Sequence, residues 1–326
     1  MSGSTPKAGN RFIVPAAIIV VLLVVGVAAG VYLTRGSSSS SSTSSTGSDS
    51  NALINVVAGE NFWGSLVSQL GGVHVNVTSV VSDPNTDPHD YQSNPANAEA
   101  ISNAKFVIVN GADYDTWALA LMASANVPNQ VVLNVQELLN QSVDANPHFW
   151  YSPYYVNYTV AVMYKDLVKI DPTDKAYFTT QYATLNSSLW TSYMKQETVI
   201  KQMFGGAPVA STESIFVYMA NATGLDVVSP PGFMQAVAEG NDPSAQDVAT
   251  MQNLMMEGNT SVRVLVYNQQ TVTPLTQTIK ALASQYQIPV IGVTETIQPP
   301  NYSFQAWMQG EVASLQNALN SEALGQ

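Results

Sequence analysis

Residues 175–204 contain neither glycine nor proline, and this uninterrupted stretch constrains the fold more than any other feature of the chain. The preceding Asp171-Pro172-Thr173-Asp174 is typical of a helix start, and Gly205-Gly206 is typical of a helix end. A helix of roughly 30 residues would be about 45 Å long. The sequence therefore predicts one stiff linking helix at 171–204, with two shorter helices joined at 184–188 as the alternative.

Four short apolar runs precede this helix and four follow it. Such runs, bounded by Gly, Pro or Asn, are typical of buried strands, and their alternation with helical stretches favours parallel sheets. The 326-residue chain is 46% hydrophobic and 10% charged, which is enough apolar material for two lobes. We predict an α/β fold in which two four-stranded parallel-sheet lobes, at 51–170 and 205–326, are joined by the long spine helix. The expected strands are Leu53–Val57, Val73–Val80, Phe106–Val109, Val131–Leu133, Pro208–Ala210, Asp226–Val228, Val262–Val266 and Pro289–Val293.

The N-terminal region differs in composition from the rest of the chain. Residues 12–33 carry no charge and are numerous enough to cross a bilayer as a helix, while Lys7 and Arg11 favour a cytoplasmic N-terminus. We predict a cytoplasmic segment at 1–11, a single-pass transmembrane anchor at 12–33 (or a cleaved signal peptide) and a flexible Ser/Thr-rich linker at 36–50. The remainder would be an extracellular domain at the cell membrane. Seven glycosylation sequons agree with this location, at Asn76, Asn140, Asn157, Asn186, Asn221, Asn259 and Asn301.

The charge balance and the absence of cysteine exclude several classes of function. Eleven basic residues against 23 acidic ones give a net charge of −12, which argues against nucleic acid as a partner. With no cysteine in the chain, there is no disulfide, no thiolate nucleophile and no lipid-modified cysteine. Membrane attachment would therefore depend on another anchor, such as 12–33.

The chain has three histidines, and two of them share a sequence context. Asp87-Pro88-His89 and Asn146-Pro147-His148 both place a histidine directly after an Asx-Pro pair. Proline fixes its own φ and favours an extended residue before it, so each histidine follows a stiff bend in a loop. Neutral imidazole is a common metal ligand, and the pair therefore predicts a transition-metal site. His74 lies in an alternating strand pattern and is expected to be structural or exposed to solvent.

These motifs resemble those of the substrate-binding proteins of zinc and manganese ABC importers. The resemblance covers roughly residues 51–322. The Asx-Pro-His pairs are in register with the other matching segments, which makes the likeness specific. The matching segments are Asp87–Tyr91, Asn94–Pro95, Ala104–Gly111, Asn146–Pro153, Ser211–Tyr218, Gly224–Leu225 and Pro243–Asp247.

The resemblance implies a metal site in the cleft between two lobes, with two protein ligands from each lobe. His89 and His148 match the first two ligands, and Glu213 matches the third, where the family carries histidine or a carboxylate. Glu295 falls at the fourth position, where aspartate is common, so the longer side chain is a departure. No catalytic or cofactor-binding residue is implied. For Glu213 the alternative is a carboxylate at the N-terminus of a helical run at 214–222.

The implied function is that of a receptor, not an enzyme. It would bind a divalent transition metal as the transported ligand and deliver it, as a monomer, to the permease of an ABC importer. Two carboxylates favour Mn²⁺, and no histidine lies between His89 and His148, where zinc receptors often carry a His-rich loop. Zn²⁺ and Fe²⁺ are the alternatives.

Other functions agree with parts of the sequence. A zinc-dependent extracellular hydrolase could use two histidines and a glutamate. The chain has no His-Glu-x-x-His motif, however, and four ligands would leave no open position for a substrate. A metal-stabilised surface adhesin would suit the sequons and the linker. A receptor for an organic solute would leave the paired Asx-Pro-His loops unexplained.

Overall fold

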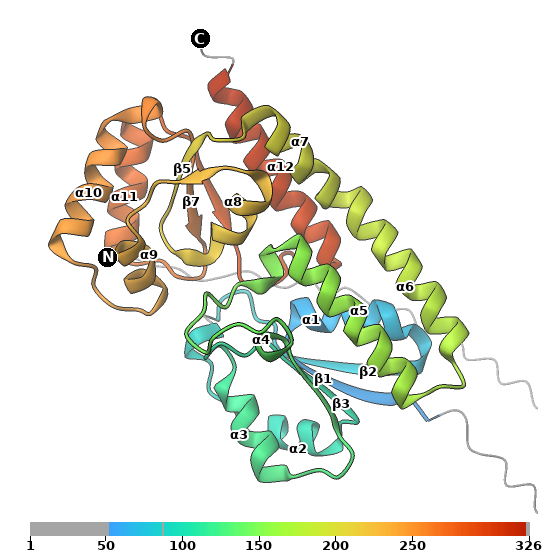
Figure 1. Ribbon diagram of the computed structural model, residues 1–326. Coiled ribbons are helices and arrows are strands. Elements are labelled where there is room, and N and C mark those ends of the chain that lie inside the picture. Colours follow the sequence, from blue (N-terminus) through green and yellow to red (C-terminus); the bar gives the residue numbers. More distant parts are fainter. Residues whose placement is uncertain (1–51, 87, 324–326) are drawn as a thin grey trace, which may run out of the picture. The chain divides into compact units, whose positions relative to one another are not determined.

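Two four-stranded sheets organise the protein (Figure 1). The computed structural model describes residues 52–86 and 88–323. In the described residues all strand pairs are parallel. Both sheets also have the same topology: numbered along the chain, the strands of each sheet lie in the order 2-1-3-4. The predicted fold class is confirmed. The N-terminal sheet has the order β2 (Val75–Val81), β1 (Ile54–Glu60), β3 (Phe106–Val109), β4 (Val131–Asn134), and the C-terminal sheet has the order β6 (Asp226–Val227), β5 (Pro208–Ser211), β7 (Leu265–Asn268), β8 (Val290–Val293).

Helices pack around these sheets, and several begin at capping residues that the sequence supplies. The Asn94 side chain accepts hydrogen bonds from two backbone amides of α2. The Thr273 side chain accepts one from the Thr276 amide, and the Thr276 hydroxyl accepts from the Thr273 amide in return. Pro95 and Pro274 occupy the first helical turn, where a missing N–H costs nothing. The helices are α1 (Asn61–Gly71), α2 (Pro95–Asn103), α3 (Thr116–Ala125), α4 (Val135–Leu138), α5 (Pro153–Ile170), α8 (Val217–Thr223), α9 (Pro231–Ala238), α10 (Ala245–Met256), α11 (Pro274–Gln285) and α12 (Phe304–Ala323).

A continuous helical segment joins the lobes, as predicted. It runs from α6 (Lys175–Leu189) through a π-helical turn (Trp190–Met194) into α7 (Lys195–Phe204). Gly206, at φ 80°, follows in the left-handed region that glycine tolerates. The π-helical turn is a local departure from the regular helix that the sequence predicts.

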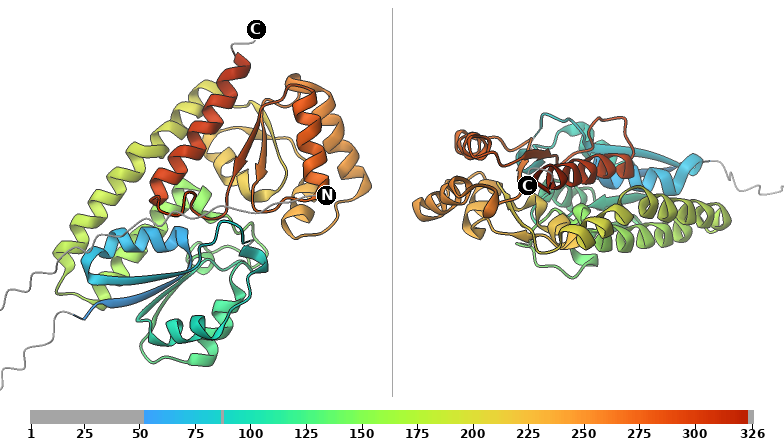
Figure 2. Two further views of the ribbon diagram at one scale, coloured as in Figure 1. Left: turned by 180° about the vertical axis from the view of Figure 1, so that it is seen from behind. Right: turned by 90° about the horizontal axis from the view of Figure 1, so that it is seen from above.

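The last helix ties the two lobes together. α12 follows the final strand of the C-terminal lobe and lies beside α7 (Figure 2). Gln316 on α12 accepts a hydrogen bond of 2.8 Å from Gln196 on α7. At the other end of α12, Gln305 donates to Gln69 of α1 at 2.7 Å. The C-terminal helix therefore bonds both to the linking helix and to the N-terminal lobe.

The strands differ from the predicted ones mainly at their ends. β2 begins at Val75 because Gly72–His74 form a 3₁₀ turn, with Gly72 at φ 51°. The expected strand context of His74 is therefore wrong. Its Nδ1 lies 2.8 Å from a carboxylate oxygen of Asp174, which agrees with a structural role. β7 lies two to three residues further along the chain than predicted, because its register is set by pairing with β8 from Leu265 onward.

No helix among residues 52–86 and 88–323 is both long and apolar enough to cross a membrane. The predicted cytoplasmic segment at 1–11, the anchor at 12–33 and the linker at 36–50 lie outside the described residues.

Candidate metal centre

His89 lies in a short 3₁₀ turn (Pro88–Asp90) on the connection that follows β2. Its Nε2 is 3.6 Å from Glu295 Oε2, and its ring packs edge-on against Tyr114 with centroids 4.8 Å apart. The side chain keeps 25% of its surface exposed. His89 therefore reaches from the N-terminal lobe to a carboxylate of the C-terminal lobe while staying accessible to solvent.

His148 begins a 3₁₀ turn (Phe149–Tyr151) and is fully buried. Its Nδ1 lies 2.6 Å from Asn146 Oδ1, a contact that requires the proton on Nδ1 because the amide oxygen only accepts. Nε2 has no hydrogen-bond partner and carries the lone pair that a metal needs. Burial, followed by the charge of His89, holds the pKa of His148 well below its usual value. The imidazole is therefore neutral over the physiological pH range.

The His148 loop is held by buried contacts to the N-terminal lobe. Asn110, at the end of β3, donates from Nδ2 to the Pro147 carbonyl at 2.8 Å and accepts from Trp63 Nε1 at 3.1 Å. Trp150 stacks on Phe62 of α1, with centroids 4.0 Å apart and planes 25° from parallel. Side chains on both sides of His148 thus fix the position of the loop.

Glu213 lies two residues after the end of β5 and is fully buried. It precedes a 3₁₀ turn (Ser214–Phe216) that leads into α8, so the predicted helical run at 214–222 is split between two kinds of helix. The Glu213 side chain makes no capping hydrogen bond to this turn. Its Oε1 instead accepts from Asn268 Nδ2 at 2.8 Å and lies 4.0 Å from His148 Nε2. Glu213 therefore lies at the start of the helical run, as the alternative expected, and also contacts Asn268 and His148.

Glu295 follows β8 and is also fully buried. Tyr114 donates to its Oε2 at 2.6 Å, and Asn268 Nδ2 donates to its Oε1. Its Oε2 lies 4.0 Å from His148 Nε2. The backbone of Glu295 is fixed as well, because its N–H donates to Gln270 Oε1 at 2.7 Å. These contacts orient the longer side chain toward both histidines.

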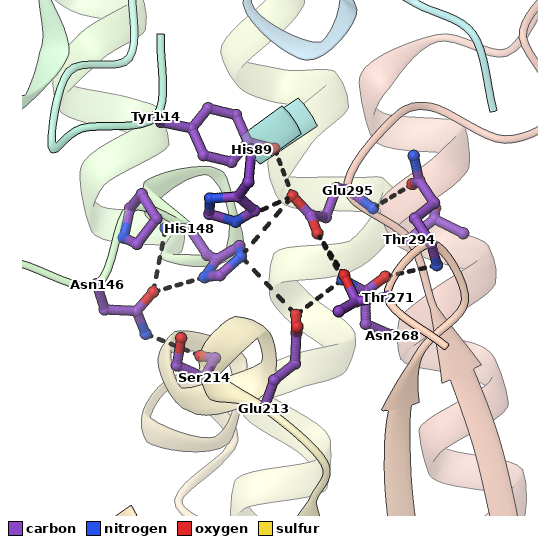
Figure 3. A network of polar contacts seen from close by, with 12 residues as sticks. His89, Tyr114, Asn146, His148, Glu213, Ser214, Asn268, Thr271, Thr294 and Glu295 are labelled. Carbon is purple, nitrogen blue, oxygen red and sulfur yellow. Dashed lines mark hydrogen bonds and ion pairs between the residues drawn. The ribbon is translucent and has the colours of Figure 1, made fainter. Parts of the chain in front are cut away.

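The four predicted ligands converge at the boundary of the two lobes (Figure 3). His89, His148 and Glu295 each offer one ligand atom, and these atoms lie within 4.8 Å of one another. Glu213 joins the group through His148 and through Asn268. The remaining histidine, His74, pairs elsewhere with Asp174. The site therefore has two imidazoles and two carboxylates, with a formal charge that balances a divalent cation.

Three polar residues of the centre were not predicted from the sequence. Asn268 ends β7 and donates to both Glu213 and Glu295, and Thr271 Oγ1 lies 3.5 Å from Glu295. Tyr114, in the turn after β3, donates to Glu295. The available signal was position: residues at or just after the carboxyl ends of parallel strands line ligand sites.

The separations suit a transition metal as the ligand of this centre. Two ligands of Zn²⁺ lie roughly 3.5 Å apart in a tetrahedral site, because each bond is about 2.0–2.2 Å. The nitrogen–oxygen distances of 3.6 and 4.0 Å are close to this value. Together, the fold and the centre define a two-lobed protein of the metal-binding class, whose candidate ligands lie in both lobes.

Comparison with known proteins identifies the family. Residues 56–318 match the family model described as "Zinc-uptake complex component A periplasmic", and the chain belongs to this family of ABC-importer substrate-binding proteins. Its members are binding proteins rather than enzymes.

Two curated relatives bind metal for ABC transporters. The metal ABC transporter substrate-binding lipoprotein FimA of Streptococcus parasanguinis is 22% identical, over 63% of this chain and 69% of that protein. The manganese ABC transporter substrate-binding lipoprotein PsaA of Streptococcus pneumoniae is 25% identical, over 54% of this chain and 61% of its own length.

Solved structures share the fold. A crystal structure of ZnuA aligns with a TM-score of 0.68 at 19% identity, over 82% of this chain and all of the other. A manganese-bound periplasmic metal-binding protein of Candidatus Liberibacter asiaticus aligns with a TM-score of 0.67 at 18% identity, over 81% of this chain and 98% of the other. At these identities the likeness supports the fold alone.

Proposed function

We propose that the protein is an extracellular receptor that captures a divalent transition metal and delivers it to the permease of an ABC importer. The observation that carries the proposal is the convergence of two histidines from one lobe and two carboxylates from the other on one point. The family membership supports the transport role. The proposed ligands are His89, His148, Glu213 and Glu295.

Mn²⁺ is the proposed cargo, with Zn²⁺ and Fe²⁺ as alternatives. Carboxylate oxygens suit harder ions, and this centre offers two of them. The names of two curated relatives specify manganese, which supports the same choice. Zn²⁺ would still outcompete Mn²⁺ in a bare affinity measurement, because most nitrogen and oxygen sites bind zinc more tightly.

The proposed organisation places the receptor at the outer face of the membrane. Residues 12–33 would anchor it, and the linker at 36–50 would keep the N-terminal lobe (51–170), the linking helix (171–204) and the C-terminal lobe (205–326) close to the permease. A tether raises the effective concentration of the receptor at its partner. The receptor would act as a monomer, since one chain supplies all four ligands.

The test is metal content and titration on the full-length protein in a maltoside detergent, stripped of metal and then reloaded. We expect one exchangeable equivalent of Mn²⁺ per chain. His89→Ala and Glu295→Gln should each weaken binding by about 100-fold or more, because each removes a direct ligand. Asn259→Ala is the control, since that side chain is exposed and is not one of the four proposed ligands, and it should bind metal as the wild type does.

The outcomes separate the proposal from its alternatives. No stoichiometric metal in the wild type would refute the receptor function. Metal that leaves only when the protein unfolds would favour a structural role in a surface adhesin. Full binding by His89→Ala would refute the ligand set, even if the chain binds metal somewhere else. A zinc-dependent hydrolase is disfavoured by the family, whose members are not enzymes.

A further inference from the structure

A pocket separate from the metal centre lies where α5, the π-helical turn, α7 and α8 meet. It has a volume of about 560 Å³, and none of the four proposed metal ligands lines it. Aromatic side chains and one carboxyl group dominate its walls. The lining residues are Ser152, Pro153, Tyr154, Tyr155, Asn157, Trp190, Met194, Glu197, Thr198, Tyr218, Asn221 and Ala222.

The carboxyl group of this pocket belongs to Glu197, which is only 2% exposed. Neither of its oxygens has a hydrogen-bond partner, and it joins no ion pair among the described residues. Glu311, also buried, is different, because its Oε1 accepts from the Thr294 amide at 3.0 Å and from Trp307 Nε1 at 2.9 Å. Buried acceptors normally have donors, so Glu197 is a group whose partner is missing from the fold.

Three polar side chains that share the pocket with Glu197 already have other partners. Tyr218 donates its hydroxyl to the Asn146 carbonyl at 3.0 Å. Thr198 donates to the Met194 carbonyl at 3.1 Å, and Asn157 Nδ2 points to the sulfur of the same methionine at 3.5 Å. None of them donates to Glu197. Among the described residues neither oxygen of Glu197 receives a hydrogen bond, and a ligand in the pocket could supply one.

The aromatic walls narrow the class of ligand. Trp190 is 52% exposed and Tyr154 is 72% exposed, so large ring surfaces border the pocket without a protein partner that covers them. Tyr155 and Tyr218 add two more rings. Aromatic faces attract cations, most strongly where water is excluded, and a carboxylate at the base supplies the counter-charge.

We propose that this pocket is a second binding site, for a small organic cation with an ammonium group, in which Glu197 is the counter-ion and Trp190 and the tyrosines form the walls. Burial raises the pKa of the Glu197 carboxyl to about 9, and a bound cation favours its ionised form. The ammonium group fits because it supplies a counter-charge for Glu197. A primary ammonium group also supplies hydrogen-bond donors for the two carboxyl oxygens. None of the four proposed metal ligands contributes to this site.

The experiment is calorimetric titration of the full-length protein in a maltoside detergent at pH 8.5. Choline tests recognition of a quaternary ammonium group, putrescine tests a primary one, and 3,3-dimethylbutan-1-ol is the uncharged match for choline. We expect at least one of the two cations to bind once per chain, and the uncharged alcohol not to bind. Glu197→Gln should weaken binding roughly 10- to 100-fold, and Trp190→Ala about tenfold.

Controls keep these outcomes interpretable. Glu99→Gln alters an exposed carboxylate on α2 and should leave cation binding unchanged. Circular dichroism and thermal unfolding of each variant show whether the fold is intact. The proposal is overturned if neither cation binds at millimolar concentration. It is also overturned if the alcohol binds as well as choline, or if a folded Glu197→Gln variant binds as tightly as the wild type.

Discussion

Replacing Glu197 with glutamine should stabilise the protein by an amount that grows with pH. Glu197 lies on α7 with both oxygens buried and without a hydrogen-bond partner. Desolvation by burial raises the pKa of this carboxyl from an ordinary 4.5 to about 9. Glutamine has nearly the same shape and carries no charge at any pH, so the exchange removes this titration and little else.

The sign and size follow from proton linkage. Between pH 4.5 and about 9 the unfolded chain carries an ionised Glu197, whereas the folded protein keeps the carboxyl neutral. The unfolded state therefore binds fewer protons, and the free energy of unfolding falls by about 1.4 kcal/mol for each pH unit in this interval. At pH 7 the accumulated loss is about 3 kcal/mol, since about 2.5 units separate pH 7 from 4.5.

Urea unfolding at pH 5, 6, 7 and 8, followed by circular dichroism, measures this directly. The quantity of interest is the difference in unfolding free energy between Glu197→Gln and the wild type. We expect it to rise by about 1.4 kcal/mol per pH unit. Other buried groups, such as Glu311, titrate in both proteins and cancel in the difference. A difference independent of pH would refute a carboxyl group held neutral by burial.

Three further predictions concern the metal centre and its supports. Asn146→Ala removes the acceptor for His148 Nδ1 and should weaken metal binding roughly 10- to 100-fold in a competition titration. Asn259→Ala, at an exposed position, should not weaken it. Equal metal affinities of Asn146→Ala and the wild type would contradict the role of Asn146 in orienting His148. Glu311→Ala leaves buried donors, including the Thr294 amide, without an acceptor. It should lower the unfolding free energy by roughly 3 kcal/mol in urea, and a loss below about 1 kcal/mol would argue against that role. Small-angle scattering of metal-free and metal-loaded protein should give nearly identical profiles, because α12 forms hydrogen bonds both to α7 and to α1. A marked compaction of the protein on metal loading would contradict this expectation.

The fold could be predicted because its strongest signals are local. A stretch without glycine or proline becomes the linking helix, and short apolar runs become buried parallel strands such as β3, which is buried along its whole length. The π-helical turn at Trp190–Met194 could not be predicted, since no residue type marks it as proline marks a kink. The start of β2 was predicted two residues too early, at Val73, because residues Gly72–His74 form a 3₁₀ turn with Gly72 at a positive φ.

The two histidines of the metal centre could be predicted from the sequence, whereas the residues that support Glu295 could not. His89 and His148 stand out because each directly follows an Asx-Pro pair, a sequence pattern that favours a bend. Asn268 and Tyr114 carry no such mark, and their roles arise only when separate strands bring them to Glu295. A residue that acts through a partner far away in the sequence leaves no local pattern.

The arrangement of the lobes also indicates how metal could reach a buried centre. His148 and both carboxylates are fully buried, whereas His89 is 25% exposed and lies on a connection whose only regular element among the described residues is a short 3₁₀ turn. Separating the lobes would break the contacts that α12 makes with α1 and α7. Moving the His89 connection would leave those contacts intact. We therefore infer that metal enters past His89, and that the surface around this connection differs most between the empty and the loaded receptor.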